Sequence, residues 1–219
     1  MSGIQDFVDY SDDFIGTSAT FPTSADQATP WLIADTSAAG TPTYVRNASN
    51  AVLTLASTSE VENVCLYHGD ALSFDIDDLI RVEFRVKVSG CTSGTSISWG
   101  VGSARNDDPT AMTALALFRM VGATSTTDVT FETDDNVTDT APVSTATSLS
   151  TTFKRFVIDF SNKSDVKAFI DGNRVCRSTT FTMAGYTSGL QPYIQIQKTS
   201  SANTDAVTVD YVRVLTRRT

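Results

Sequence analysis

The stretch Arg81-Val82-Glu83-Phe84-Arg85-Val86-Lys87-Val88 decides the fold class of this chain. Apolar residues occupy every second position, and charged residues occupy the positions between them. Because successive side chains of a β-strand point to opposite faces, this alternation predicts a strand with one buried and one solvated face. A sheet with a single solvated face is typical of antiparallel strands.

The same alternation recurs in Lys154-Arg155-Phe156-Val157-Ile158-Asp159-Phe160, and Asp171-Gly172 between two apolar runs predicts a tight hairpin turn. Further strands are predicted at residues 96–101, 115–121, 166–170, 193–197 and 207–215. The polar residues 136–152, rich in Thr, Ser and Ala, are predicted to form a loop. Many strands at short intervals without intervening helices indicate a β-sandwich or a barrel.

Length and composition agree with one all-β unit. A chain of 219 residues suits a single sandwich, and its 24 serines and 33 threonines favour turns and the outer faces of strands. Residues 31–219 are therefore predicted to form a single β-sandwich domain. Residues 1–30 are predicted to be an N-terminal arm or a first strand.

The charge balance bears on possible partners. The formal net charge of −9 argues against binding to nucleic acid, which requires a basic face, and against adsorption to an anionic membrane. The N-terminus has no basic segment followed by an apolar segment, so no signal peptide is expected. The chain is expected to be made in a cytoplasm.

Two passages carry a resemblance to a known fold. The last predicted strand, Val209-Asp210-Tyr211-Val212-Arg213-Val214, resembles the closing strand of concanavalin A-like jelly rolls, which include the laminarinase-like β-glucanases. Residues 155–175, RFVIDFSNKSDVKAFIDGNRV, also look like that fold. The resemblance implies an all-β, antiparallel β-sandwich of the concanavalin A-like, jelly-roll type.

Such glucanases use two carboxylates that flank the scissile glycosidic bond. They place their carboxylates on one face of one strand, as Glu-x-Asp-x-x-Glu or a near variant. Glu132-Thr133-Asp134-Asp135-Asn136 lacks the final Glu and is interpreted as a solvated loop edge or a weak cation site. The single histidine, His68, has no Gly-x-Ser-x-Gly partner motif and is read as a hydrogen-bonding turn residue. No catalytic residue, metal site or cofactor is predicted, and the chain is not expected to be an enzyme.

Residues 6–16, DFVDYSDDFIG, and 61–77, VENVCLYHGDALSFDID, resemble decoration (cement) proteins of tailed bacteriophage capsids. This resemblance implies a virion structural protein on the capsid surface, made in the host cytoplasm. It would bind the major capsid protein as a homo-oligomer, with a trimer favoured and a dimer possible. The apolar N-terminal residues Ile4, Phe7, Tyr10 and Phe14 are the predicted contacts with the capsid or with a neighbouring subunit.

The alternative prediction is a carbohydrate-binding, lectin-like module, which could also lie on a phage particle. Sugar sites combine exposed aromatic rings with polar side chains. Trp31, at a loop-to-strand junction, and Tyr186 are the predicted glycan contacts. Trp99 shares a strand face with Ile97 and Val101 and is predicted to lie in the core.

Overall fold

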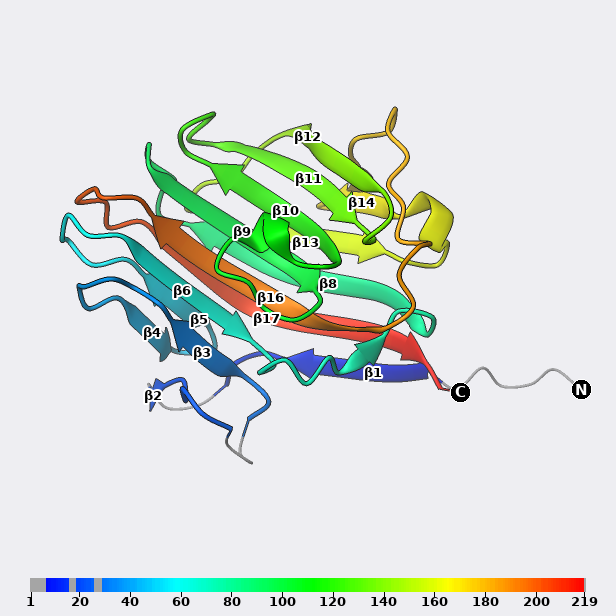
Figure 1. The fold of residues 1–219 in the computed structure, drawn as a ribbon, viewed down its shortest axis with the longest axis horizontal. Helices are drawn as coiled ribbons and strands as arrows, with labels where there is room; N and C mark the ends of the chain where they lie inside the picture. The colour runs from blue at the N-terminus through cyan, green and yellow to red at the C-terminus, as the bar shows by residue number, and fades with distance from the viewer. Residues whose placement is uncertain (1–6, 16–18, 26–28, 219) are drawn as a thin grey trace, which may run out of the picture.

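The computed structural model describes residues 7–15, 19–25 and 29–218 of the chain, and two antiparallel β-sheets pack face to face in it (Figure 1). The nine-stranded sheet contains β1 (Phe7–Asp12), β2 (Ala19–Thr20), β4 (Thr43–Arg46), β5 (Ala51–Thr54), β8 (Leu79–Val88), β13 (Lys154–Asp159), β14 (Lys167–Ile170), β15 (Asn173–Arg174) and β17 (Ala206–Arg217). Its order is β15-β14-β13-β8-β17-β5-β4-β2, and β1 also pairs with β17.

The eight-stranded sheet contains β3 (Leu32–Asp35), β6 (Glu62–Tyr67), β7 (Phe74–Asp75), β9 (Thr95–Gly102), β10 (Leu115–Val121), β11 (Asp128–Asp134), β12 (Asp139–Ser148) and β16 (Gly189–Lys198). Its order is β12-β11-β10-β9-β16-β6-β3, with β7 on the end of β16. Two single 3-10 turns, η1 (Pro109–Ala111) and η2 (Lys163–Asp165), interrupt the connections. Within the described ranges, no helix is long and apolar enough to cross a membrane.

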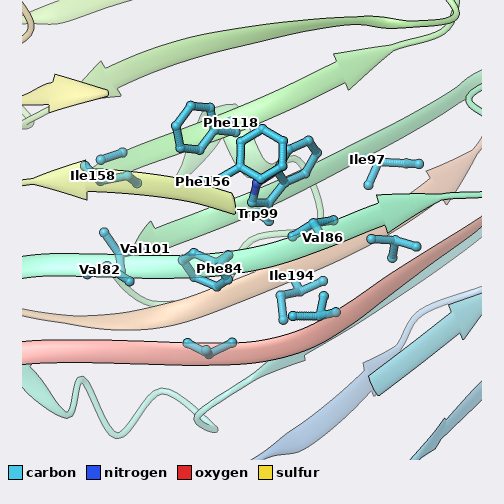
Figure 2. Close-up of a cluster of buried hydrophobic side chains, with 14 of the residues drawn as sticks. Val82, Phe84, Val86, Ile97, Trp99, Val101, Phe118, Phe156, Ile158 and Ile194 are labelled. Carbon is cyan, nitrogen blue, oxygen red and sulfur yellow. The ribbon is translucent and has the colours of Figure 1, made fainter. Parts of the chain in front are cut away.

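The core lies between the two sheets, as the alternation predicts. Val82, Phe84 and Val86 of β8 point inward and are fully buried. From the opposite sheet, Trp99 meets Phe156 at a ring-centroid distance of 4.9 Å, edge to face (Figure 2). Edge-to-face packing adds to the burial of two large rings, so this pair anchors the middle of the sandwich. The prediction of an all-β, antiparallel sandwich is confirmed.

One sequence prediction about the fold is wrong. Residues 136–152 are not a loop, because β12 lies among them as the edge strand of the eight-stranded sheet. Most of its side chains are exposed or half-buried, so its sequence shows no apolar alternation. Hydroxyl groups and Pro142 suit an edge strand, whose outer backbone groups face away from the sheet.

The first strand lies beside the last one. Phe7 pairs with Arg217 and Asp12 with Val212, so β1 runs antiparallel along the second half of β17 (Figure 1). The guanidinium of Arg213 forms a two-pronged ion pair with the Asp9 carboxylate across the two strands. The first and last strands that the structure describes are therefore neighbours in the nine-stranded sheet.

Candidate functional site

The outer face of the eight-stranded sheet gathers amide side chains from its two central strands. Because neighbouring residues alternate, Val64 and Ile194 enter the core while Asn63, Gln191 and Gln195 point outward. Outward-pointing side chains of a sheet are ordinarily solvated, yet Gln191 and Gln195 are 0% and 1% exposed. Part of the chain therefore covers this face.

The cover is the connection between β9 and β10, residues 103–114, which we call the 103–114 segment. Its backbone carbonyls accept hydrogen bonds from the sheet: Asn106 from Tyr193 Oη at 3.1 Å, Asp107 from Gln195 Nε2 at 2.9 Å, and Ser103 from Gln191 Nε2 at 2.9 Å. Figure 1 shows this connection in green, in front of the middle of the sheet.

An apolar contact holds the 103–114 segment as well. Met112 packs with Cys65, Leu117 and Tyr193 in a small buried cluster separate from the main core. Burial raises the pKa of the Cys65 thiol, so this sulfur stays protonated beneath the segment. The polar and apolar contacts together fix the segment on the sheet.

The connection between β6 and β7 also holds the 103–114 segment in place through hydrogen bonds. Asp70, in the connection that follows β6, accepts hydrogen bonds through Oδ1 from Arg105 N and Gln191 Nε2, both at 2.7 Å. Asp70 and Leu72 have φ angles of +60° and +46°, which lie in a backbone region that residues other than glycine rarely adopt. Strained backbone of this kind is characteristic of functional or tightly constrained loops.

Beyond the 103–114 segment the same face opens into a pocket of about 210 Å³. It is lined by Arg119 and Val121 of β10, Asp128 and Thr130 of β11, Ser125 of the turn between them and Pro142 of β12. The pocket combines hydrogen-bonding groups with an apolar wall, as small-molecule sites in proteins do. We call it the β10–β11 pocket.

Arg119, which lines the β10–β11 pocket, forms an ion pair with a buried acid. Arg119 Nη1 donates to Glu132 Oε1 at 2.9 Å, and the two side chains are only 13% and 6% exposed. Burial raises the pKa of the Glu132 carboxyl, and the neighbouring Arg119 guanidinium opposes that shift. Asp139 and Asp108 raise the pKa further, so Glu132 lies in acidic surroundings.

This geometry corrects the interpretation of residues 132–136 as a solvated loop edge. Glu132 belongs to β11 and is buried, because the covered face of the sheet and Arg119 enclose it. The sequence does carry a signal for the position of Glu132. Arg119, Thr130 and Glu132 stand at outward positions of two adjacent apolar strands, where the alternation itself predicts a shared face.

The predicted glycan contacts do not lie in this pocket. Trp31 is fully buried in the core, where its Nε1 donates to Asp12 at 2.8 Å and its ring lies 5.4 Å from that of Phe14, so it presents no surface to a ligand. Tyr186 is half-buried beside η2, and its hydroxyl donates to the Gly189 carbonyl at 3.2 Å. The structure does not bring these two residues together.

The N-terminal residues predicted as capsid contacts are also dispersed. Phe7 is 50% exposed on β1, Tyr10 packs against the core, and Phe14 is buried at 1%. Phe14 is therefore part of the sandwich and offers no surface to a capsid. Ile4 lies outside the described residues.

Comparison with known proteins gives the fold a context. No protein-family model matches the chain, and no curated protein matches its sequence. Among solved structures, the catalytic domain of an endo-1,3-beta-glucanase (laminarinase) from Thermotoga petrophila RKU-1 superimposes with a TM-score of 0.67 and 12% identity. The match covers 99% of this chain and 100% of that one.

The descriptions of two other similar structures refer to carbohydrate cleavage and carbohydrate recognition. One is described with endo-acting O-glycanases that human gut bacteria use to initiate mucin breakdown, with a TM-score of 0.68, 11% identity, and coverage of 96% of this chain and 99% of that one. The other is the carbohydrate recognition domain of Emp47p, with a TM-score of 0.62, 13% identity, and 96% of each chain covered. The fold is that of the concanavalin A-like jelly rolls.

These comparisons contradict one prediction from the sequence. The sequence predicts that the chain is not an enzyme, yet its structural neighbours include endo-glucanases of the same architecture. The missing Glu-x-Asp-x-x-Glu motif was therefore too narrow a ground for excluding catalysis. The resemblance to capsid decoration proteins finds no counterpart among these neighbours.

Proposed function

We propose that this chain is a carbohydrate-binding domain whose glycan site is the β10–β11 pocket on the outer face of the eight-stranded sheet. The observation that carries the proposal is the composition of that pocket. Arg119 and Asp128 offer a donor and an acceptor, Thr130 and Ser125 offer hydroxyls, and Val121 and Pro142 form an apolar wall.

A sugar ring has matching chemistry, with hydroxyl groups around its edge and C–H groups on its faces. Edge hydroxyls would hydrogen-bond to Arg119, Asp128 and Thr130, while one face of the ring would lie against Pro142. The fold supports this assignment, because its structural neighbours include enzymes named for glucans and a carbohydrate recognition domain.

The position of the pocket also supports the proposal. The 103–114 segment occupies the middle of the face with three hydrogen bonds from Tyr193, Gln195 and Gln191, together with the burial of Met112. Each hydrogen bond contributes roughly 0.5–1.5 kcal/mol, and burial of the Met side chain roughly 1.5–3 kcal/mol. Displacement of the segment would cost several times the thermal energy, so a ligand binds beside it rather than under it.

The proposal is tested by a substitution that fills the β10–β11 pocket with a large side chain. Thr130 points outward from β11, and tryptophan suits a strand, so Thr130→Trp should fold while its ring occupies the pocket. Thr54→Trp, outward on β5 of the opposite sheet, is the matched control. Wild type and Thr54→Trp are expected to bind the same members of a glycan array, and Thr130→Trp at least about tenfold more weakly.

Isothermal titration with the best oligosaccharide gives the affinities, and release of reducing ends in the same samples reports whether the bound glycan is also cleaved. Equal binding by Thr130→Trp would place the glycan elsewhere. An array without a hit would refute the proposal. Capsid decoration, the other function predicted from the sequence, stays a prediction that binding to bare phage heads would test.

A further inference from the structure

We propose that the β10–β11 pocket discriminates against anionic glycans, and that Asp128 and Glu132 are the residues that set this preference. The inference rests on the proposed glycan function and names the class of sugar that the same pocket accepts. It starts from the distribution of charge over the face around the pocket.

Acidic side chains predominate on the outer face of the eight-stranded sheet. They include Asp70, Asp107, Asp128, Glu132, Asp134 and Asp139. Asp134 and Asp139 are direct cross-strand partners, which places both side chains on one face. These six acids outnumber Arg105 and Arg119 on the same face, so the face carries a net negative charge.

Arg105 and Arg119, the arginines on this face, are each paired through Nη1 with a carboxylate of the protein. Arg105 Nη1 pairs with Asp107 at 2.5 Å, and Arg119 Nη1 pairs with Glu132 at 2.9 Å. A carboxylate or sulfate on a sugar would have to compete with these carboxylates for the same guanidinium groups. The one arginine that lines the pocket is thus balanced by a buried acid of the protein itself.

Asp128 adds a further negative charge, at the wall of the pocket. Its Oδ1 accepts a hydrogen bond from the uncharged Ser144 hydroxyl at 3.0 Å. An anionic sugar would therefore meet Asp128 directly and Glu132 just behind Arg119. Like charges a few ångströms apart in a partly enclosed site are weakly screened, so each carboxylate should weaken anion binding by about three- to tenfold.

The raised pKa of Glu132 is consistent with this picture, because it reflects burial and the nearby carboxylates of Asp139 and Asp108. The opposite face of the molecule differs. There a pocket of about 250 Å³ is lined by two arginines, Arg81 and Arg155, as well as by Glu83 and Asp159. That pocket provides the contrast that the experiment needs.

The experiment compares two probes that differ only in charge: laminaritriose, and laminaritriose oxidised at C6 from primary alcohols to carboxylates. Dissociation constants are measured by titration calorimetry in 20 mM and 500 mM salt. For the wild type, the oxidised probe should bind at least about tenfold more weakly, and high salt should narrow the difference.

Single substitutions show which residues are responsible for the difference in affinity between the two probes. Asp128→Asn and Glu132→Gln should each reduce the ratio of the two constants by about threefold or more. Asp159→Asn, an isosteric change on the opposite sheet, should leave the ratio unchanged. Thermal melting checks that Glu132→Gln, which removes the partner of Arg119, is still folded, and Asp128→Asn tests the proposal independently of that ion pair.

The outcomes separate the two proposals. Equal or tighter binding of the oxidised probe in the β10–β11 pocket would overturn the discrimination and leave glycan binding intact. Failure of every glycan on the array and of both probes would remove the proposed function and this inference with it. The oxidised probe could instead bind in the pocket that Arg81 and Arg155 line on the nine-stranded sheet. In that case its binding would be retained in Thr130→Trp and lost in Arg155→Gln. That result would support the proposal, because the anion would then avoid the β10–β11 pocket.

Discussion

His68, the one histidine of the chain, lies in a box of aromatic rings. Its imidazole is 4.5 Å from the ring of Trp31, 5.6 Å from Tyr10 and 6.0 Å from Phe74, and its Nδ1 lies 3.2 Å from Ser73 Oγ. Burial lowers the pKa of His68 to about 4, partly opposed by the carboxylate of Asp12. The folded protein therefore holds this ring neutral at pH values where the unfolded chain protonates it.

This difference predicts a loss of stability in acid. The stabilising effect is fully present above pH 6.5, the ordinary histidine pKa, and is lost as the pH falls towards 4, by roughly 3 kcal/mol in total. Urea unfolding at pH 7 and pH 4.5 should show a smaller acid loss for His68→Gln than for the wild type. Carboxylates titrate alike in both proteins, so equal losses would show that His68 is not the cause.

The sequence could predict the location of His68 at a strand end but not its environment. A histidine next to a glycine indicates a turn, whereas the box is assembled from residues as far as 58 positions away. The same limit explains why Trp31 was predicted to contact a glycan although it is buried. Its burial depends on Phe14 and Asp12 from the N-terminal segment. Contacts distant in sequence leave no local pattern to be recognised.

At the level of elements, a fully buried ion pair joins the ends of β6 and β16. Lys198 Nζ lies 3.6 Å from Glu62 Oε2, and both side chains are 0% exposed. Lys198 also donates to the carbonyls of Thr58 at 2.7 Å and Asn203 at 3.3 Å, while Glu62 accepts from the Ala56 amide at 2.8 Å. The pair therefore fastens two loops to one end of the sandwich.

Removal of one partner from this pair should be costly. Lys198→Met leaves the Glu62 carboxylate buried without a counter-charge, and we expect a loss of about 3–5 kcal/mol in the free energy of unfolding. The double variant Lys198→Met/Glu62→Leu should recover much of that loss, because it removes both buried charges. Chemical unfolding of the wild type, Lys198→Met, Glu62→Leu and the double variant gives the coupling free energy between the two residues, and additive losses would contradict it.

The 103–114 segment leads to another prediction at this scale. In a Cys91→Ala/Cys176→Ala background, the Cys65 thiol should react with an aromatic disulfide reagent only on unfolding, since the thiol is 0% exposed beneath Met112. Replacement of residues 104–113 by a four-residue Gly/Ser turn should make Cys65 reactive within minutes. Rapid labelling of the protein with the intact segment would show that the segment opens readily.

The sequence predicted the strands of the core and missed the elements of the site. β8 and β13 each have one apolar face, and the alternation that produces it is visible in the sequence of each strand. The 103–114 segment binds the sheet through backbone carbonyls, which every residue possesses, so its role depends on tertiary contacts alone. The β10–β11 pocket was missed for the same reason, since it requires the turn and the edge strand to meet.

At the scale of the whole molecule, β1 completes the nine-stranded sheet along β17. Deletion of residues 1–12 removes this strand, its ion pair between Asp9 and Arg213, and the Tyr10 ring that packs on His68. We expect a loss of about 3 kcal/mol or more, as for removal of a large buried side chain. Asp9→Asn, which breaks only an exposed ion pair, should cost under about 1 kcal/mol, and similar losses in both variants would contradict this role of β1.

The position of β17 also has a consequence for the way the protein is made. This strand is the last in the sequence, yet it lies between β8 on one side and β5 and β1 on the other. While the ribosome synthesises the chain from its N-terminus, three earlier strands must wait with unpaired edges until residues 206–217 have emerged. Until then β8, β5 and β1 lack their shared partner, and a chain truncated before Ala206 would leave the nine-stranded sheet in three pieces: β15-β14-β13-β8, β5-β4-β2 and β1 alone.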